Sequence, residues 1–562
     1  MSNHPSGADD APPLPSSSGA EFVPPLVAFE TMTPADGDDV DHAIDEIDDH
    51  NSGVEITPRP ARPSWWEIGV AVAIFVAFCG LVSSKSPQLL EPDDYAYRAS
   101  IVALSHGDVT LTAAQYQALA KELGGTSITL PTAGGNVIGP GSAPDPGGLG
   151  IPSFGAGGPG GDGPKPGFGG PGDMGSQGIM QWVKRADGTY ISEKNPGYPY
   201  LALPFQAMGI LRAAPLFYGG LACLALFAGL RRWVGSWAGT WAVALFCASG
   251  AAAAFAWRST MPTFTDASLI AVGVGTLIWA FLATDRADRW RTIVGLAGFV
   301  ALEAAVAIRY TNIIFLIVAI VAAVVFLRRT SLPKVTAGWW GGSLVAFALL
   351  MAWWNLHYYG SPLSTGYSSG EITFSLGSIG PNLIHMPAHL VKSMPMIVLA
   401  LAGLVWMIVR LVQSRSLDGI ARGRARRDAT IGAVLAAGWF GLWVLYLAYD
   451  WTVRMAGDDH GGSIHTIRFY MPALGVIAAL GAWLLVQLPR WLAPVTVAGL
   501  MAVSVSTFGI LSTDQGSPGG HRPDGGFGQI GQPGGPGDDG LMPDGFPPGM
   551  GPGEDAGQDN GS

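Results

Sequence analysis

The 562-residue chain is 49% hydrophobic and only 13% charged, with a formal net charge of −11. The acidic residues gather at the ends, because residues 1–58 hold thirteen Asp or Glu and no Lys or Arg, and residues 512–562 hold eight and one Arg. The remaining body is therefore basic, at about +9, and apolar. This distribution excludes an ordinary soluble domain and argues against nucleic-acid binding, and three cysteines within apolar segments argue against a disulfide framework.

Composition divides the chain into three parts. Residues 1–63 are acidic and rich in Pro, Ser and Asp, which predicts a disordered cytoplasmic tail. Residues 64–511 are predicted to form one membrane domain, with a Gly/Pro-rich insertion at 134–178 in an outer loop. Residues 512–562 are again rich in Gly and Pro, and they predict a disordered outer tail. We prefer a flexible spacer to a specific polymer contact for both Gly/Pro-rich segments.

The membrane domain contains eleven apolar segments of the length that an α-helix needs to cross hydrocarbon. Because backbone groups in lipid must satisfy one another, the expected fold class is an all-α polytopic membrane protein with about 11 transmembrane helices. The predicted spans are 66–83, 213–230, 235–255, 265–283, 292–307, 311–327, 336–354, 394–413, 430–448, 470–488 and 491–511.

Arginine and lysine lie mainly in every second connection between these segments, at 231–232, 286–291, 328–334, 415–427 and 490. Connections with this excess face the cytoplasm in most membrane proteins. We therefore expect a multi-pass protein of the cell (inner or plasma) membrane, with its N-terminus in the cytoplasm and its C-terminus outside.

The long first outer loop is expected to contain interfacial helices. Asp94, Tyr97, Ile101 and Leu104 share one helical stripe, which predicts a helix along the membrane surface. A second helix is predicted from Thr112, because Gln115 three residues later completes a capping box. Its predicted apolar face is Tyr116, Leu119, Ala120 and Leu123, its end is Gly124-Gly125, and a third segment follows at 198–212.

Asp93 and Asp94 follow the first span directly, where a pair of carboxylates is costly unless it has a function. One alternative is structural, since acids after Pro92 stabilise a helix N-terminus. The other is general-base chemistry on a substrate hydroxyl. Asp94 lies on the stripe that we expect to face a cavity, and Asp93 lies about 100° away, so Asp94 is the predicted base and Asp93 is secondary.

A third carboxylate, Asp266, lies at the mouth of the fourth span, and Arg258 in the preceding turn is its available partner. An ordinary loop salt bridge is the alternative for this pair. Three other cations, Lys194, Arg309 and Arg468, stand on the outer side within polar-aromatic motifs. Each alone is explained by contact with lipid headgroups, but together they predict a phosphate site.

Two histidine-containing clusters could suggest metal ligands, but neither has a strong metal-binding pattern. His385 and His389 have the i, i+4 spacing of a metal pair on a helix, without the HExxH pattern. Asp458, Asp459, His460 and His465 form a polar cluster, for which a solvated Gly-rich loop is preferred. We therefore expect no metal site and no required cofactor, although a divalent metal is compatible with the sequence.

Several motifs, in their order and on their membrane side, resemble those of the GT-C superfamily of membrane glycosyltransferases. The branch in question contains protein O-mannosyltransferases and aminoarabinose transferases. Asp93-Asp94 resembles the acidic motif after the first span, 194–199 resembles the Pro-rich motif before the second, and 468–472 resembles the late Arg-aromatic-x-x-Pro motif. Asp266 and the segments 355–362 and 365–367 resemble further family features.

The resemblance implies transfer of a sugar from a polyprenyl-phosphate donor to an acceptor protein, lipid or glycan at the outer membrane face. It implies inverting attack with Asp94 or Asp93 as the base and Asp266 nearby. Lys194, Arg309, Arg468 and Arg258 become candidates for the donor phosphate, and Tyr97, Tyr198, His357 and Tyr367 for the sugar or acceptor pocket.

Two other functions fit the pattern. A transporter or flippase of lipid-linked sugars also needs cations and many spans, but it is expected to show internal repeats and broken helices near the bilayer midplane. A non-catalytic scaffold that binds cell-envelope polymer needs no clustered site. The enzyme is favoured over the scaffold if the acidic residues and the outer cations surround one cavity. The acidic residues are Asp93, Asp94 and Asp266.

Overall fold

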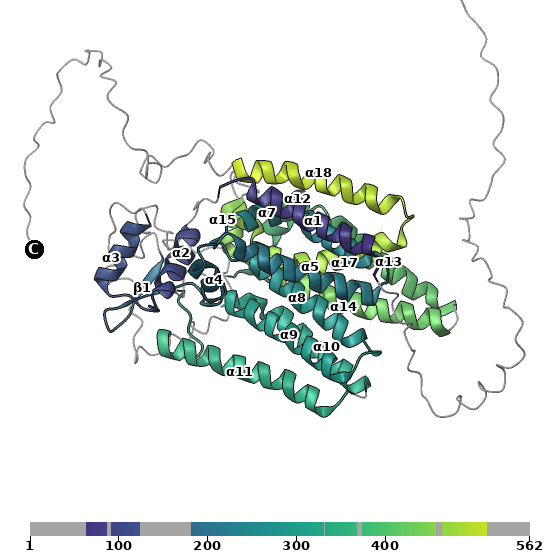
Figure 1. The fold of residues 1–562 in the computed structure, drawn as a ribbon, viewed down its shortest axis with the longest axis horizontal. Helices are drawn as coiled ribbons and strands as arrows, with labels where there is room; N and C mark the ends of the chain where they lie inside the picture. Colours follow the sequence, from purple (N-terminus) through teal and green to yellow (C-terminus); the bar gives the residue numbers. More distant parts are fainter. Residues whose placement is uncertain are drawn as a thin grey trace, which may run out of the picture. The chain divides into compact units, whose positions relative to one another are not determined.

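The structure is a computed structural model that describes residues 63–86, 92–123, 181–330, 332–367, 374–416, 419–456 and 464–513, all within one compact unit, Ile56–Ser562. The acidic tail up to residue 62, the 134–178 insertion and the tail from residue 514 lie outside these ranges. Within them, nine helices are long and apolar enough to cross a membrane, so the chain is an all-α multi-pass membrane protein. They are α1 (Trp65–Ser83), α5 (Ala213–Trp233), α8 (Thr263–Leu282), α9 (Asp288–Ile308), α10 (Ile313–Arg329, extended by the 3-10 turn η2, Tyr310–Asn312), α11 (Lys334–Tyr359), α13 (Ile397–Gln413), α14 (Gly419–Leu447) and α18 (Leu492–Thr513) (Figure 1).

The segment predicted as one span at 235–255 is instead two helices, α6 (Ala238–Cys247) and α7 (Gly250–Trp257), bent by 63°. The Ser249 hydroxyl accepts a hydrogen bond from the Ala252 N–H at 3.1 Å and starts the second helix. Gly250 then passes so close to α18 that a Cβ there would lie 2.5 Å from the Thr507 Cβ. A capping serine and a close helix crossing therefore break a segment whose apolarity is continuous.

The segment predicted as a span at 470–488 is shorter than expected. It consists of the 3-10 turn η5 (Met471–Ala473) and α17 (Leu474–Gln487), which is buried over nearly its whole length and packs on α6, α8 and α13. A helix that is apolar all round is typical of a bundle interior as well as of a lipid-facing span. Apolarity alone therefore could not distinguish a central helix from a full span.

Helices α5 and α8 approach each other closely at glycine residues, where no side chain separates their backbones. A Cβ added at Gly275 would lie 2.3 Å from the Ala225 backbone, whereas one at Gly341 on α11 would meet nothing within 4 Å. We expect Gly275→Ala to lower the free energy of unfolding by about 1–3 kcal/mol, because an overpacked contact forces the two helices apart. Thermal unfolding in detergent measures this, with Gly341→Ala as the control. Equal melting temperatures for the two variants would contradict the tight crossing.

The chain between α1 and α5 forms what we call the loop module, residues 92–123 and 181–207. It contains α2 (Pro92–Ser105), α3 (Ala113–Glu122), the antiparallel hairpin of β1 (Trp182–Lys184) and β2 (Tyr190–Ser192), and α4 (Gly197–Ala207). The predicted capping box at Thr112 and Gln115 is confirmed, and so is the apolar face of α3 that carries Tyr116. Its predicted end at Gly124-Gly125 lies outside the described residues. The hairpin was not predicted; it is held in place by Tyr116, whose ring stacks on Tyr190 at 4.9 Å.

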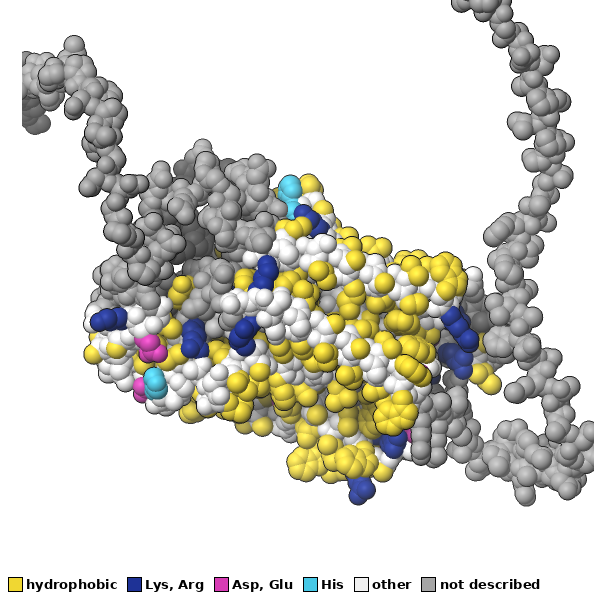
Figure 2. Space-filling view, turned by 45° about the horizontal axis from the view of Figure 1, so that its top comes forward, with side chains coloured by type: hydrophobic (Ala, Val, Ile, Leu, Met, Phe, Trp, Pro, Cys, Tyr) yellow, Lys and Arg dark blue, Asp and Glu magenta, His cyan; other side chains and the backbone are white. Residues whose placement is uncertain are grey.

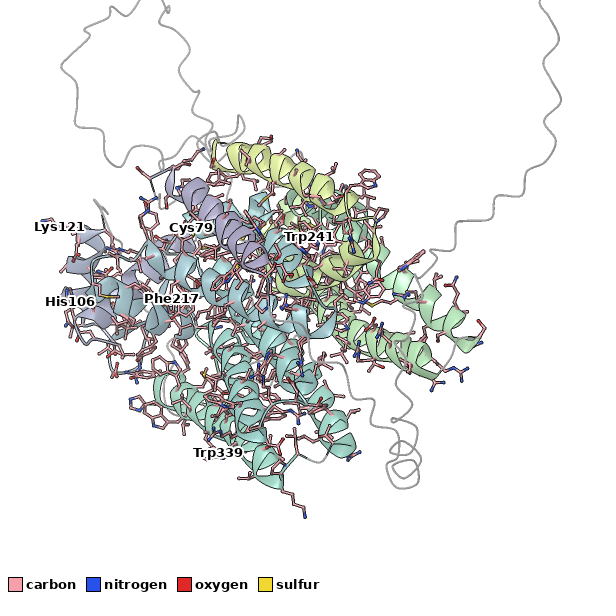
Figure 3. All side chains as sticks on the ribbon, turned by 45° about the vertical axis from the view of Figure 1, so that its right-hand side comes forward. Cys79, His106, Lys121, Phe217, Trp241 and Trp339 are labelled. Atoms are coloured by element: carbon pink, nitrogen blue, oxygen red, sulfur yellow. The ribbon has the colours of Figure 1, made fainter. Side chains whose placement is uncertain are left out.

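The loop module lies at one end of the spans, which we call the module end (Figure 1; His106 and Lys121 mark the module in Figure 3). At the opposite end, which we call the arginine end, the start of α1 lies beside the ends of α5 and α8. There Arg231 pairs with Glu67, and Arg232 pairs with Asp285. Shorter elements complete the described chain: η3 (Leu376–Ser378), α12 (Ile379–Ser393), η4 (Ser414–Ser416), α15 (Asp450–Ala456) and α16 (Ile464–Ile467).

Large apolar side chains remain exposed along the spans, and hydrophobic side chains are spread over the middle and right of the surface visible in Figure 2. The exposed tryptophans at the arginine end lie at or near the starts of α1, α6, α9, α11 and α18: Trp65, Trp66, Trp237, Trp290, Trp339 and Trp491 (Trp339 is labelled in Figure 3). Tryptophan is enriched at membrane–water interfaces. These tryptophans therefore mark one edge of the apolar surface.

Candidate functional site

Asp93, in the first turn of α2, lies between two cations from distant parts of the chain. Its Oδ1 is 3.0 Å from Lys194 Nζ, and its Oδ2 is 2.6 Å from Arg468 Nη1. The Asp93 side chain keeps 19% of its surface exposed. Burial raises the pKa of the Asp93 carboxyl, but the two cations outweigh it and hold the pKa well below its usual range. Asp93 is therefore ionised and clamped at a partly open position.

Lys194 enters the site from the turn between β2 and α4. Its ammonium also pairs with Glu193 Oε1 at 2.8 Å and lies 5.0 Å from the centre of the Tyr367 ring. Burial lowers the pKa of Lys194, but Asp93 and Glu193 outweigh burial and hold it well above its usual value. The next segment approaches closely at Gly366, where a Cβ would lie 2.4 Å from the Glu193 Cα. Glycine at that position therefore allows Tyr367 to reach Lys194.

Arg309 and Arg468 are joined through the backbone and a shared ring. Arg309 interrupts the helix between α9 and α10, and its Nη1 donates to the Arg468 carbonyl at 2.9 Å. The Phe469 ring centre lies 5.4 Å from the Arg309 guanidinium carbon and 4.9 Å from that of Arg468, and the Trp451 ring centre lies 5.1 Å from Arg468. Aromatic faces stabilise cations, so the two guanidiniums are held near each other despite their like charge.

Asp266 is completely buried in the first turn of α8. Asn312 of η2 donates its amide to Asp266 Oδ1, and Arg309 Nε lies 3.7 Å from Oδ2. Asp266 therefore reaches the cluster through Arg309. The partner expected from the sequence, Arg258, is instead bound to Asp94.

Asp94 differs sharply from its neighbour, since both Asp94 and Arg258 are 0% exposed. Arg258 Nη2 lies 2.5 Å from Asp94 Oδ2, and the Thr260 hydroxyl donates to Oδ1 at 3.1 Å. The expectation that Asp94 faces a cavity is therefore wrong, because Arg258 and Thr260 enclose it, while Asp93 is the partly exposed member of the pair. Tyr97 and Ile101 of the stripe are buried in the main hydrophobic core, and the same contact buries Asp94.

Tyr97, the aromatic residue of the stripe, shows how that contact forms. Tyr97 meets Tyr198 edge to face, with ring centres 5.9 Å apart, and the buried Tyr198 hydroxyl donates to the Ser259 carbonyl. Tyr97 and Tyr198 thus pack α2 and α4 onto the turn before α8, and Tyr367 lies beside Lys194.

His357 is the predicted pocket residue that the structure places elsewhere. Its imidazole is exposed and stacks on Trp353 at 5.6 Å, and its carbonyl accepts from Arg185. Two residues later, Tyr359 does reach the module, where its hydroxyl donates to the Ser192 carbonyl at 3.0 Å. The prediction identified the right helix end, but the helical rotation turns the His357 side chain away from the site.

The histidine pair at His385 and His389 does lie on a helix, α12. Among the described residues, no group of three His, Cys, Asp or Glu side chains comes together as metal ligands would. Asp458, Asp459 and His460, and the side chain of His465, lie outside the described part of the chain.

Three cations and three carboxylates from five segments thus meet at the module end: Lys194, Arg309, Arg468, Asp93, Glu193 and Asp266. Sequence reasoning missed Glu193, Asn312, Trp451 and Phe469. Glu193 and Phe469 were marked only by adjacency to Lys194 and Arg468. Lys194 and Arg468 are already paired with carboxylates, so an anion that binds them competes with Asp93 and Glu193.

No family model matches the chain, and no match was found among curated proteins. Among solved structures it is similar to one titled "Crystal Structure of ArnT from Cupriavidus metallidurans bound to Undecaprenyl phosphate". The identity is 14% and the TM-score 0.38, and the match covers 80% of this chain and 64% of the other, less than two thirds of that protein. A likeness at this level does not decide activity, which must be inferred from the site.

Proposed function

We propose that the chain is a membrane glycosyltransferase that moves a sugar from a polyprenyl-phosphate donor to an acceptor hydroxyl at the Asp93 site. One observation carries the proposal: Asp93 is the partly exposed carboxylate of a cluster that also holds three converging cations at the end of the spans. A base beside an anion site is what this transfer needs.

The donor phosphate would bind to Lys194, Arg309 and Arg468. Arginine binds phosphate through paired N–H donors, and lysine binds it as a compact charge. Because the cluster lies where α8 and α10 begin, the polyprenyl chain of the donor can remain in lipid while its phosphate reaches the cations. This placement favours a lipid-linked donor over a soluble nucleotide sugar.

In the transfer, the acceptor hydroxyl oxygen forms a bond to the anomeric carbon as the bond from that carbon to the phosphate oxygen breaks. The bonding electron pair leaves with the polyprenyl phosphate, whose growing negative charge the three cations stabilise. Asp93 takes the acceptor proton. Attack opposite the leaving phosphate inverts the anomeric configuration.

Donor binding would also release the base. Lys194 and Arg468 hold Asp93 in the structure and lower its pKa, so the clamped carboxylate is a weak base. A phosphate that competes for the same two cations loosens that hold and raises the pKa of Asp93. The base then becomes effective only when the donor is bound.

The buried Asp94–Arg258 pair has a positioning role in this proposal, because it fixes the start of α2 against the turn before α8. Asp266 orients Arg309 and η2 in the same way. The sugar and the acceptor are not specified by these contacts.

The test uses the purified full-length protein in vesicles with radiolabelled polyprenyl-phosphate sugars and membrane extract as the acceptor source. Transfer of label together with release of polyprenyl phosphate is the expected result. Movement of intact donor across the bilayer without release would instead identify a flippase. Neither release nor movement with any donor would favour the scaffold.

Arg468→Gln should raise the donor KM about ten- to hundredfold, corresponding to the roughly 1.5–3 kcal/mol of a hydrogen bond to a charged group. The effect falls on KM first because the phosphate contact already exists in the ground state. Initial rates over a range of donor concentrations measure it. The matched control is Arg185→Gln, since Arg185 also has an Asp partner, Asp187, and an aromatic neighbour, Tyr358. An unchanged KM in Arg468→Gln would remove Arg468 from the phosphate site.

A further inference from the structure

A cavity of about 340 Å³ lies at the arginine end, between the end of α13 and the start of α14. Its lining combines apolar side chains with arginines: Leu411, Val412, Ser414, Arg415, Arg422 and Arg426. Arg426 and Tyr446 are twenty residues apart on α14, or about 30 Å along the helix, and Tyr446 contacts Thr311 near the Asp93 site. The cavity is therefore separate from the candidate active site.

Arg422 builds the wall of the cavity. Its Nε donates to the Ser414 carbonyl at 3.3 Å, and its Nη2 donates to the Arg415 carbonyl at 3.0 Å. These bonds satisfy carbonyls where α13 and η4 end. Arg415 and Arg426 line the same cavity with exposed side chains, so their charges are available to a ligand.

An apolar stripe leads along α13 to this cavity. The exposed residues Val398, Leu401, Val405, Ile408 and Val412 follow one another at steps of three or four, which places them on one helix face. Val412 belongs both to the stripe and to the cavity lining. A molecule with an anionic head and a long apolar chain would contact the arginines and the stripe together.

We propose that this cavity binds the headgroup of an anionic phospholipid, with the phosphate between Arg415 and Arg426 and an acyl chain along the α13 stripe. Basic pockets beside membrane helices bind anionic headgroups in this way. A free phosphate would satisfy the two arginines but would leave the stripe unused, so the stripe favours the lipid.

Native mass spectrometry of the full-length protein in neutral detergent tests the proposal by titration with phosphatidylglycerol, phosphatidylcholine or inorganic phosphate. We expect one saturable phosphatidylglycerol adduct, no matching phosphatidylcholine adduct, and no displacement by inorganic phosphate. Arg415→Gln and Arg426→Gln should each weaken the adduct about fivefold, and together about twenty-fivefold, at roughly 1 kcal/mol for each charge. Arg424→Gln, at an exposed position of α14 outside the lining, is the matched control and should bind as the wild type does.

Val412→Asp provides a second variant that keeps every arginine. It places a negative charge where stripe and cavity meet, so the phosphatidylglycerol adduct should be lost. Displacement of the lipid by inorganic phosphate would reduce the site to a phosphate site and overturn the lipid proposal. Unchanged binding in Val412→Asp, or equal weakening in Arg424→Gln and Arg426→Gln, would also overturn it.

Discussion

Asp93→Asn should lower the turnover of glycosyl transfer by about 10²–10⁴-fold, the usual contribution of a general base. Asparagine fills the same volume but cannot take the acceptor proton. Donor affinity should be kept or improved, because the phosphate no longer competes with a carboxylate for Lys194 and Arg468. Initial rates at saturating donor and the donor KM measure the two effects separately.

The matched control for this substitution is Asp187→Asn. Asp187 also belongs to the loop module and pairs with an arginine, Arg185, at 2.8 Å, but its side chain is 49% exposed and it does not join the cation cluster. Normal turnover in Asp93→Asn, with loss in Asp94→Asn at an unchanged melting temperature, would return the base to Asp94. Loss in both Asp93→Asn and Asp187→Asn would indicate that the module itself is disturbed.

Arg258→Met should reduce the free energy of unfolding by about 3–5 kcal/mol, because it leaves the buried carboxylate of Asp94 without its cation. Methionine is unbranched and fills much of the same space, so the change mainly removes charge. Thermal unfolding of the purified protein measures the loss, and the effect on turnover should follow the unfolded fraction.

Adding Asp94→Asn to Arg258→Met should recover part of this stability, since no unpaired buried charge then remains. Thr260 can still bond the amide that replaces the Asp94 carboxylate. If the loss in free energy of unfolding of the double variant equals the sum of the losses in the two single variants, the two side chains are not coupled as the geometry requires. If it is stable and transfers sugar, Asp94 cannot be the base.

Continuous apolar segments were enough to predict nine of the eleven expected membrane spans, since a helix that crosses lipid must be apolar along its length. They could not predict the break between α6 and α7 or the burial of α17. Both depend on contacts with distant helices, such as the passage of Gly250 against Thr507. The local pattern of apolar residues does not indicate which distant helices will pack against a segment.

Within the loop module, the local sequence was enough to predict the start of α3 but not the β1–β2 hairpin. The capping box at Thr112 and Gln115 formed as predicted because both partners lie within one helical turn. The motifs also singled out Asp93, Lys194, Arg309 and Arg468, which belong to four separate segments of the chain. Their convergence joins residues up to 375 positions apart, and only the packed fold brings them together.

Tertiary structure alone decided which aspartate is buried. Helical geometry turns Asp93 and Asp94 about 100° from each other but does not say which face another element will cover. The turn before α8 brings Arg258 and Thr260 over Asp94, whereas Lys194 and Arg468 leave Asp93 partly open. Burial of a charge depends on the partner that compensates it, and that partner comes from elsewhere in the chain.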